Sequence, residues 1–494
     1  MISGYILTLD LGSSSIRTAV VSQDWRIVGE AQRPYRKYRS MGNAERFSPA
    51  DLQIRMFDCL AAAVQCSKVS SNAISLIAIT AQRGGAAFFD AHGSTLYVGP
   101  NTDSRAVFEG AAIDDLMAAE IYATTGHLPS MFLTPAKLHW WRNHYPRRAR
   151  QIATVTSLGS WAAHQLSGAF GETPSTVIEA GLADVTTGQL AETLLTKLGV
   201  SLRELPKVVS EGAVIGTLSQ EAADATGLRF EIPVALAGPD AQVSALGAGS
   251  VSPGDNAVIA GWSAPVQRVT TTPIFDSSKR TWVGRHALSD RWVAEANPGD
   301  TGRTLETVLR MLGPRMSLQR FDRLAATAPE RDLPIIAAWG PRALDMSSPG
   351  MSLGGLITPS PITYQGIDAG AVARATLENI TFAIRECLAL LDQVGGANHE
   401  PLTLAGGMAN SPLFASMLSA SVGRPVRHQS ARSTAIGAAL ISSLSNNDLR
   451  IAADQITQQV PSLYPSPLDV RSATERYERW LHVRRKLDQL AEEI

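Results

Sequence analysis

The sequence predicts an α/β protein with two large domains. Its 494 residues exceed the length that one hydrophobic core usually supports, so two domains are the natural expectation. Short apolar segments typical of buried strands alternate with longer segments of helical periodicity. A strand, a Gly/Ser turn and a second strand follow one another near the N-terminus, and the same pattern returns at mid-chain. Two related half-chains explain this repetition.

The composition is that of a globular protein and argues against several classes of partner. Hydrophobic residues make up 45% of the chain and charged residues 18%, with a formal net charge of -1. This balance gives no reason to expect a nucleic acid or an anionic membrane as partner. No apolar run approaches the roughly 20 residues of a membrane span. The three cysteines form no CxxC motif, and the first residues lack the features of a signal peptide. We therefore expect a soluble, cytoplasmic protein.

The first predicted element is an apolar strand, Tyr5 to Leu9, that runs into a Gly/Ser turn and a returning strand, Thr18 to Val21. The backbone N–H groups and hydroxyls of Gly12 to Ser14 can face a phosphate. Asp10 beside them can hold Mg²⁺ through water, because Mg²⁺ prefers carboxylates together with phosphate oxygens and keeps much of its hydration. An ordinary hairpin is the alternative, since Gly/Ser turns are common.

Polar residues follow the next predicted strand, Ile74 to Thr80. Gln82 and Arg83 come directly after it, and Asp103 lies in a later segment. These side chains carry donors and acceptors that can bind the hydroxyls of a ligand. In the alternative interpretation, Asp103 simply pairs with Arg105.

Two other segments of the first half are predicted to be structural. Ser48 to Cys66 is an amphipathic helix with Ser48 as its N-cap. Met131 to His144 contains a tryptophan pair on a short helix. Taken alone, this pair is core packing, and Lys137 carries a solvated or ion-paired charge.

At mid-chain, the strand Val234 to Ala237 is predicted to end just before Asp240. Open α/β sheets place their ligands at this edge. Small residues at helical spacing follow, and a second apolar strand, Ala257 to Ala260, leads into Gly261-Trp262-Ser263. A carboxylate and a Gly/Ser turn at strand ends suit an acid/base group beside a phosphate-binding loop. On these residues alone, a helix-capping Asp and an ordinary hairpin are favoured.

The second half continues the alternation of strands and helices. A strand over Trp292 to Ala296 and helices over Thr304 to Leu312 and Ala369 to Val394 are predicted. The strand Leu402 to Ala405 enters Gly406-Gly407, and glycines at such a turn let an adenine or ribose lie against the backbone.

The C-terminal helix is predicted to begin with Ser472 and Glu475 as a capping box. Tyr477, Trp480 and Leu487 fall on one of its faces. We expect a docking helix without chemistry of its own.

The order of these motifs resembles that of the FGGY carbohydrate kinases, in the actin-like, sugar-kinase and Hsp70 ATPase superfamily. Asp10 to Arg17 resembles the family's first phosphate motif, Phe132 to His144 its signature, and Gly238 to Gly249 its catalytic-aspartate motif. Gly406 to Leu413 resembles its adenosine segment. The resemblance runs nearly end to end, and such collinearity is more specific than any single motif.

The resemblance implies two ribonuclease-H-like domains of the actin-like ATPase type with a cleft between them. Residues 1–247 would form the N-terminal domain, with the substrate site, the first phosphate motif and the catalytic aspartate. Residues 248–494 would form the C-terminal domain, with the second phosphate motif, the adenosine site and the docking helix. The implied reaction is the phosphorylation by ATP and Mg²⁺ of a hydroxyl on a small sugar, polyol or related molecule. A homodimer is a further hypothesis, because one sequence does not fix the oligomeric state.

The resemblance also implies a role for individual residues. Asp240 would be the general base that takes the proton of the substrate hydroxyl as it attacks the γ-phosphate of ATP, and Asp10 would hold the hydrated Mg²⁺. The implied substrate contacts are Gln82, Arg83, Asp103 and Gln242. The implied nucleotide contacts are Gly12, Ser13, Ser14, Arg17, Gly261, Ser263, Gly406, Gly407 and Asn410.

Several positions depart from the family pattern. Trp262 stands where Thr is usual in the second phosphate turn, so a hydroxyl contact is lost unless Ser263 replaces it. Met408 stands where a third Gly is common, Arg432 where an acidic residue is common, and Asn101 where Trp is usual. These changes indicate a different acceptor, weaker nucleotide binding or a degenerate kinase. Because both site carboxylates remain, a working enzyme is favoured.

Two other functions compete with the kinase. A chaperone-type ATPase or sensor is disfavoured, because the sequence shows no peptide-binding domain or helix-turn-helix extension and carries the kinase signature. A catalytically impaired paralogue is suggested by Trp262 and Met408. Among acceptors, Gln82-Arg83 resembles the pair of glycerol kinases, whereas Gly84 and the Asn-x-Asp-x-Arg motif at 101–105 resemble autoinducer-2 kinases. Pentuloses and tetritols are further candidate acceptors.

Overall fold

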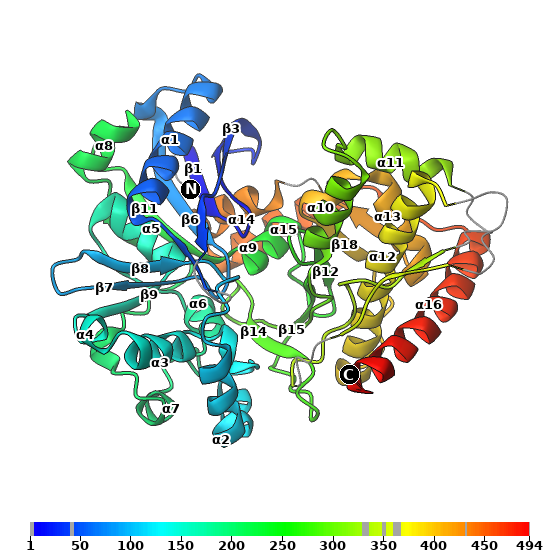
Figure 1. Cartoon of the computed structure of the whole chain (residues 1–494). Helices are drawn as coiled ribbons and strands as arrows, with labels where there is room; N and C mark the ends of the chain where they lie inside the picture. Colours follow the sequence, from blue (N-terminus) through cyan, green and yellow to red (C-terminus); the bar gives the residue numbers. More distant parts are fainter. Residues whose placement is uncertain are drawn as a thin grey trace. The chain divides into compact units, whose positions relative to one another are not determined.

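The chain folds into two compact α/β units. A computed structural model describes residues 4–39, 44–328, 335–347, 352–358, 367–429 and 432–493, in which helices flank mixed sheets (Figure 1). The first unit comprises Met1–Val251, Thr270–Val293 and Arg432–Ile456, and the second comprises Ser252–Val269, Ala294–Ala431 and Thr457–Ile494. The predicted two-domain α/β class is confirmed, and the boundary at residue 247 stays a prediction.

A six-stranded sheet of order β10-β11-β6-β1-β2-β3 forms the centre of the first unit. Strands β1, β6 and β11 run parallel to one another, whereas β2 pairs antiparallel with β1. The C-terminal ends of the three parallel strands therefore lie at one edge of the sheet. The strands are β1 (Tyr5–Leu11), β2 (Ser15–Val21), β3 (Ile27–Pro34), β6 (Ile74–Ala81), β10 (Val214–Thr217) and β11 (Pro233–Pro239).

Helices cover both faces of this sheet because its strands are apolar on both faces. Leu7 and Leu9 of β1 pack in one cluster with α1 and α5, whereas Ile6 packs in another with α9 and α14. The helices of the unit are α1 (Pro49–Ser67), α2 (Val107–Thr125), α3 (Thr134–His144), α4 (Pro146–Ala149), α5 (Leu158–Ser167), α6 (Pro174–Glu179), α7 (Glu192–Lys197), α8 (Gln220–Thr226), α9 (Asp240–Gly247), α14 (Ser433–Ile441) and α15 (Asn446–Gln459). Ser48 caps α1 by accepting a hydrogen bond from the backbone N–H of Asp51, as predicted.

Helices α9 and α14 approach each other through glycines. A Cβ atom on Gly437 would lie 1.9 Å from the carbonyl oxygen of Val243, and one on Gly247 would lie 2.0 Å from that of Ser433. The hydroxyls of Ser244 and Ser433 are 2.7 Å apart. The small residues predicted at helical spacing thus allow a backbone-to-backbone contact that holds the helix beginning at Asp240.

A smaller sheet of order β8-β7-β9 completes the first unit together with α2 and α3. Its hairpin brings Phe88 and Tyr97 together, and Trp141 of α3 packs edge-on against Phe88. The remaining strands are β4 (Lys37–Arg39), β5 (Glu45–Phe47), β7 (Ala86–Phe89), β8 (Thr95–Gly99), β9 (Thr154–Ser157) and β14 (Trp282–Arg285).

The second unit repeats the arrangement of an antiparallel strand pair joined to a parallel strand. Strand β12 pairs antiparallel with β13 and parallel with β18, in the order β15-β13-β12-β18-β19-β20. The strands are β12 (Asn256–Ile259), β13 (Val266–Thr270), β15 (Trp292–Ala296), β16 (Ile336–Ala337), β17 (Leu356–Ile357), β18 (Leu402–Ala405), β19 (Val426–His428) and β20 (Ser462–Leu463). The helices are α10 (Thr301–Leu312), α11 (Leu318–Thr327), α12 (Ala369–Gly395), α13 (Pro412–Val422) and α16 (Pro467–Glu493).

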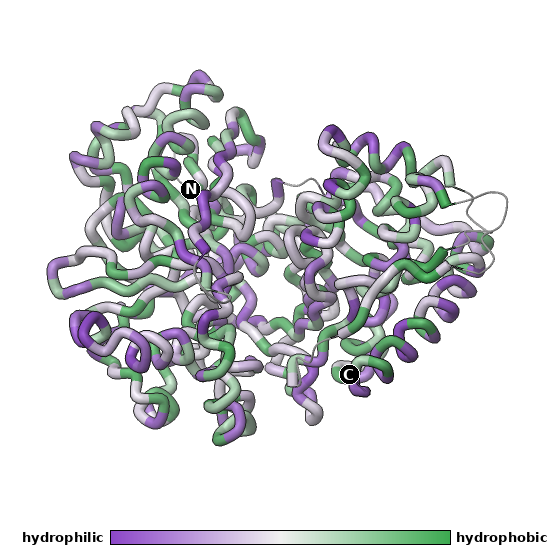
Figure 2. The backbone as a smooth tube through the Cα atoms, in the orientation of Figure 1, coloured by the Kyte–Doolittle hydropathy of each residue, from purple (hydrophilic) through white to green (hydrophobic). Residues whose placement is uncertain are grey.

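The start of the C-terminal helix was predicted wrongly. Helix α16 begins at Pro467, and the hydroxyl of Ser466 accepts a hydrogen bond from the backbone N–H of Asp469. Proline suits the first turn because it has no N–H to lose there, so the cap precedes the predicted Ser472. Hydrophilic and hydrophobic residues alternate along the helix (Figure 2).

The buried face of α16 includes cations that the apolar pattern did not predict. Trp480 is buried as expected and donates a hydrogen bond to the carbonyl of Ala337. Arg484 is buried as well, because its guanidinium donates to the carbonyls of Ala338 and Leu353.

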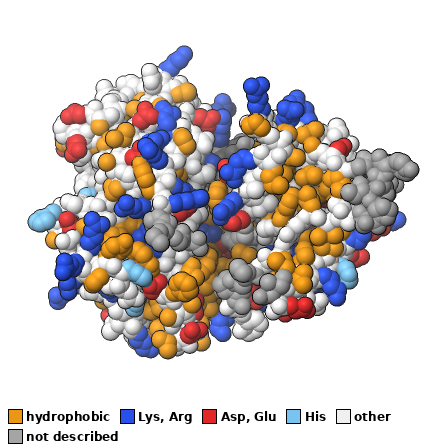
Figure 3. Space-filling view, viewed as in Figure 1, with side chains coloured by type: hydrophobic (Ala, Val, Ile, Leu, Met, Phe, Trp, Pro, Cys, Tyr) orange, Lys and Arg blue, Asp and Glu red, His pale blue; other side chains and the backbone are white. Residues whose placement is uncertain are grey.

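The surface matches the charge balance of the sequence. Basic and acidic side chains are interspersed over the visible face of each unit (Figure 3). Among the described residues, no helix has both the length and the apolar content needed to cross a bilayer.

Candidate active site

Three predicted site residues meet at one edge of the first unit's sheet. Asp10 lies near the end of β1, Gln82 follows β6, and Asp240 follows β11 as the first residue of α9. The register aligns Asp10 with Thr80 and Pro239 with Ala81, so the three strands end side by side. Ligands of α/β sheets bind at such edges.

The strands on either side of the predicted first phosphate turn are longer than expected, so the turn itself is shorter. Strand β1 continues to Leu11 and β2 begins at Ser15, so the turn consists of Gly12, Ser13 and Ser14. The side-chain amide of Asn101 donates to the Ser13 hydroxyl over 3.1 Å. Asn101, which departs from the family pattern, therefore supports the turn directly.

The side chain of Gln82 braces the same turn. Its Nε2 donates to the carbonyl of Gly12 over 3.1 Å, and its Oε1 accepts from the backbone N–H of Asn101 over 3.0 Å. Both ends of the amide are thus engaged within the protein. The substrate contact predicted for Gln82 stays a prediction. Its role in bracing the turn could not be predicted from the sequence, because its partners are distant in the chain.

Asp10 and Asp240 form an electrostatically coupled pair of carboxylates. Burial, followed by the negative charge of Asp10, raises the pKa of Asp240 to about 7, and Arg83 opposes this shift. Burial raises the pKa of Asp10 to about 6, and Arg17, opposite it on β2, opposes that shift. A carboxylate with a pKa near neutrality is suited to accept and release a proton.

The environment of Asp10 also fits a hydrated Mg²⁺. Its Oδ1 is buried and has no hydrogen-bond partner among the described residues. Nowhere among the residues that the structure describes do three or more His, Cys, Asp or Glu side chains form a cluster that could hold a metal ion. A single carboxylate is sufficient for Mg²⁺ when water and phosphate oxygens complete its shell.

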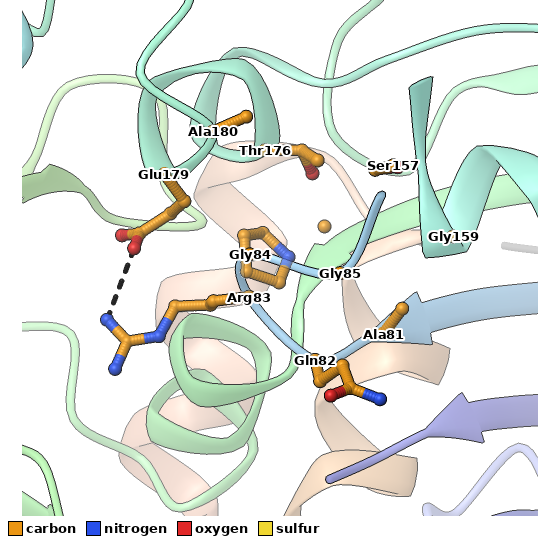
Figure 4. A pocket seen from close by; sticks show the side chains of 12 residues that line it. Ala81, Gln82, Arg83, Gly84, Gly85, Ser157, Gly159, Thr176, Glu179 and Ala180 are labelled. Atoms are coloured by element: carbon orange, nitrogen blue, oxygen red, sulfur yellow. Dashed lines mark hydrogen bonds and ion pairs between the residues drawn. The ribbon is translucent and has the colours of Figure 1, made fainter. Parts of the chain in front are cut away.

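Arg83 lines a pocket that also includes Gly84, Gly85 and Thr176 (Figure 4). The Nη1 atom of Arg83 lies 3.3 Å from Oε2 of Glu179 at one end of this pocket. The side chain of Gln82 points away from the arginine in the same view. Arg83 therefore faces the pocket with its charge compensated by a buried carboxylate.

Glu179 is the centre of a polar network that sequence reasoning missed. It accepts hydrogen bonds from Gln242 over 2.5 Å and approaches Nε2 of His127 at 3.2 Å. Burial raises the pKa of Glu179, but the charges of Arg83 and His127 and the hydrogen bonds from His127 and Gln242 outweigh it and lower the value to about 2. Trp282 adds a ring whose centroid is 5.4 Å from the Arg83 guanidinium. Arg83 and Gln242 were predicted from their motifs, whereas Glu179, His127 and Trp282 belong to no local motif that the sequence could have revealed.

Asp103 pairs with Arg105, which is the alternative considered for it. Its carboxylate lies 2.6 Å from Nε of Arg105, accepts from the Tyr97 hydroxyl and accepts from the backbone N–H of Glu45 over 2.9 Å. This cluster fixes the loop that carries Asn101. A contact of Asp103 with substrate stays a prediction.

Lys137 differs from the solvated or ion-paired charge that was predicted. Only 1% of the residue is exposed, and its Nζ donates to the carbonyl of Gly84 over 2.5 Å. Burial lowers its pKa to about 8, although Asp103 opposes the shift. The hydrogen bond from Lys137 thus holds the loop directly after Arg83 in place.

In the second unit, the predicted second phosphate turn rests on the start of α10. The carbonyl of Trp262 accepts hydrogen bonds from the backbone N–H groups of Gly302 and Arg303. The Ser263 hydroxyl donates to Oδ1 of Asn297 over 2.9 Å. Gly302 packs closely against Gly261, because a Cβ atom on Gly302 would lie 2.1 Å from the carbonyl oxygen of Gly261. The backbone of Trp262 therefore anchors the turn, and its indole lies against Arg303, with 5.8 Å between the ring centroid and the guanidinium carbon.

The predicted adenosine segment lies next to this turn. Gly406 has a φ of +94°, and a Cβ there would lie 2.6 Å from the carbonyl oxygen of Ala260. Gly407 has open space, with no described atom within 4 Å of a Cβ placed on it, and Asn410 is exposed. The Met408 side chain points into the core, so this departure from the family pattern leaves the segment's outer side uncovered.

The family of the chain follows from comparison with known proteins. Residues 5–247 match the N-terminal domain of the FGGY family of carbohydrate kinases, and residues 271–445 match its C-terminal domain. The chain therefore belongs to the FGGY family of carbohydrate kinases, enzymes that phosphorylate small sugar substrates with ATP.

Individual relatives cover nearly the whole chain. The autoinducer-2 kinase of Klebsiella pneumoniae subsp. pneumoniae is 25% identical over 504 residues, which cover 96% of this chain and 93% of the relative. The structure of xylulose kinase from Rhodospirillum rubrum has a TM-score of 0.81 at 22% identity and covers 99% of this chain and 100% of its own. Plasmodium falciparum glycerol kinase with ADP has a TM-score of 0.82 at 15% identity, over 98% of each chain. These structures share the fold.

Proposed function

We propose that the protein transfers the γ-phosphoryl group of ATP to a hydroxyl of a small, uncharged sugar or polyol. Asp240 acts as the general base. The observation that carries this proposal is the environment of Asp240, at the end of a central strand and beside Asp10, which raises its pKa to about 7. At neutral pH such a group is available both to accept a proton and to release it afterwards.

In the proposed reaction, the carboxylate of Asp240 orients the acceptor hydroxyl and accepts its proton. The acceptor oxygen bonds to phosphorus while the bond between phosphorus and ADP breaks. Bound Mg²⁺ would supply charge neutralisation for the phosphates, and Asp10 would hold it through water. The unpartnered Oδ1 of Asp10 supports this assignment.

The remaining roles are assigned from the site geometry and the family resemblance. The turn Gly12 to Ser14, with Arg17, and the turn with Gly261 and Ser263 bind phosphates through backbone N–H groups and hydroxyls. Gly406, Gly407 and Asn410 bind the adenosine. Gln82, Arg83, Asp103 and Gln242 form the acceptor site, directly or by fixing its walls.

The compensated charge of Arg83 supports an uncharged acceptor. Because Glu179 already neutralises the guanidinium, a carboxylate or phosphate on the acceptor would have to compete with a buried ion pair. Hydroxyls can instead share the N–H groups of Arg83 and the free Oε1 of Gln242. Pentuloses, tetritols, glycerol and autoinducer-2, the substrate in the name of several relatives, are the candidates.

The test is ADP formation from Mg-ATP with a panel of these acceptors and with a sugar acid as a charged comparison. We expect one neutral acceptor to stimulate ADP formation strongly and the sugar acid to be inert. Preference for the sugar acid would contradict the proposed acceptor class. Absence of stimulation by every acceptor, together with absent ATP binding, would favour an impaired paralogue.

A further inference from the structure

Tyr35 lies beside the first phosphate turn, although no motif pointed to it. It directly follows Pro34, the last residue of β3, and Pro34 pairs with Ser15 at the start of β2. Ser15 in turn directly follows the phosphate turn. The Tyr35 ring packs against Phe47, with 4.8 Å between the ring centroids, so the side chain is held in place.

The hydroxyl of Tyr35 is buried and lacks a hydrogen-bond partner within the described parts of the chain. Gln82 approaches the hydroxyl closely enough to oppose the rise in its pKa, with the smallest effect of the groups around it. No well-formed hydrogen bond joins the two side chains, because both ends of the Gln82 amide are engaged with Gly12 and Asn101. A buried hydroxyl without a partner costs about 1–3 kcal/mol, so native structures rarely keep one without a reason. A ligand that accepts its hydrogen bond would remove this cost.

Three further buried atoms around the same sheet edge have no hydrogen-bond partner among the residues that the structure describes. They are Oδ1 of Asp10, Oδ1 of Asn101 and Oε1 of Gln242. All three are acceptors, whereas Tyr35 contributes an O–H donor. This donor is therefore suited to an anionic oxygen at this edge, in addition to the donors of the predicted phosphate turn.

The charged groups that act on Tyr35 keep it in its neutral form. Burial, followed by the negative charges of Asp10 and Asp240, raises the pKa of Tyr35 well above its ordinary value, with Arg17 opposing them. The phenol therefore keeps its proton at neutral pH. It can donate a hydrogen bond, but it cannot act as a base.

We propose that Tyr35 is a further catalytic residue, whose hydroxyl donates a hydrogen bond to an oxygen of the γ-phosphoryl group during its transfer. This inference rests on the function proposed above. Asp240 accepts the proton of the acceptor, the new oxygen–phosphorus bond forms and the bond to ADP breaks, while Tyr35 keeps its own proton. Its place beside the phosphate turn, rather than beside Arg83, favours the phosphoryl group over the acceptor as its partner.

The Tyr35→Phe variant tests the proposal because it removes only the hydroxyl. We expect kcat to fall about hundred- to thousandfold, as for other single donors to a transition-state oxygen, with both KM values nearly unchanged. Calorimetry gives a readout without turnover. The affinity for Mg-ADP with aluminium fluoride, which mimics the phosphoryl group in flight, should fall about tenfold, and that for Mg-ADP alone should not. Tyr38→Phe, at a partly exposed tyrosine of the neighbouring strand β4, is the matched control and should behave as wild type.

The outcomes separate this inference from the function on which it rests. If the wild type is active and Tyr35→Phe keeps its kcat and its affinity for the aluminium fluoride complex, the role of Tyr35 is refuted and the kinase proposal stands. A raised acceptor KM with unchanged kcat would refute the phosphoryl contact as well. If the wild type itself phosphorylates no acceptor, the proposed function fails. The melting temperature should not fall in Tyr35→Phe, because the removed hydroxyl makes no hydrogen bond in the free protein.

Discussion

Arg83 and Glu179 form a buried ion pair, with 3.3 Å between Nη1 and Oε2. Glu179 belongs to α6, and it also accepts a hydrogen bond from Gln242 and approaches His127. One carboxylate thus fixes two side chains of the proposed acceptor site. Removal of one partner of a buried pair leaves the other charge uncompensated, which is usually costly.

We predict that Glu179→Gln raises the acceptor KM at least tenfold and changes kcat less. The glutamine keeps the size of the side chain but no longer holds the guanidinium of Arg83 in place. Steady-state kinetics of Glu179→Gln, Arg83→Ala and the double variant measure the coupling. The two changes should be far from additive, because they disrupt one interaction. Glu204→Gln, which affects a partly exposed pair with Arg142, is the control. Additive effects would mean that Glu179 acts independently of Arg83.

The rate of transfer should depend on the ionisation of Asp240. Its pKa is raised to about 7 by burial and by Asp10, with Glu179 adding to the shift and Arg83 opposing it. Because the base must be deprotonated, kcat/KM should fall about tenfold per pH unit below this value and level off above it. A pH–rate profile between pH 5 and 9 measures this. A flat profile across that range would contradict the assignment.

The raised pKa of Asp240 also predicts that folding stability falls as the pH rises, whereas the rate of transfer increases. The folded state binds a proton on Asp240 more tightly than the unfolded state does, so the stabilisation from this proton is complete near pH 4 and is lost as the pH rises through about 7. Asp240→Asn removes the cost of burying the charge. Urea unfolding should therefore show the variant to be more stable than wild type at pH 8, by more than about 1 kcal/mol, and similar to it at pH 4. If the variant and the wild type were equally stable at both pH values, burial of the Asp240 carboxylate would not raise its pKa.

Gly302 lies outside the predicted motifs, yet Gly302→Ala should weaken nucleotide binding. The new methyl group would meet the carbonyl of Gly261 at 2.1 Å and force the second phosphate turn to move. Overpacking of this kind costs about 1–3 kcal/mol, and we expect the affinity for Mg-ADP to fall by about five- to hundredfold. Gly355→Ala is the control, because no described atom lies within 4 Å of the added Cβ. Wild-type affinity in Gly302→Ala, measured by calorimetry, would remove this turn from the nucleotide site.

Lys137→Met should affect both stability and the acceptor site. The methionine fills the same space but leaves the carbonyl of Gly84 without its donor, which costs about 1–3 kcal/mol. The loop after Arg83 would loosen, and the acceptor KM should rise. Lys197→Met, at a half-exposed lysine paired with Glu120, serves as the matched control for both measurements. A melting temperature and a KM equal to those of wild type would show that Lys137 has no role in positioning the loop.

The sequence allowed prediction of features that depend on local pattern. The strand before Asp240, the Ser48 cap and the helix of small residues after Asp240 follow from periodicity, capping and small-residue spacing. The partner that this helix contacts, α14, could not be predicted. The boundaries were less certain where two signals competed. Ser466 and Pro467 start the last helix before the predicted box at Ser472.

Features that depend on contacts between distant residues could not be predicted. Glu179 and His127 join Arg83 only because α6 and the segment after α2 fold beside β6. Lys137 looks like an ordinary charged residue in sequence, and its burial is explained only by the carbonyl of Gly84. Tyr35 belongs to no motif, and the pairing of β3 with β2 places it at the phosphate turn.

The most direct test of the account compares Asp240→Asn with wild type on the best neutral acceptor. ADP formation and ATP affinity are measured on the same preparations. We predict that the variant binds ATP nearly as wild type does and loses several orders of magnitude in rate, because only the base is removed. A near-normal rate in Asp240→Asn would contradict the central claim that this carboxylate accepts the proton of the acceptor.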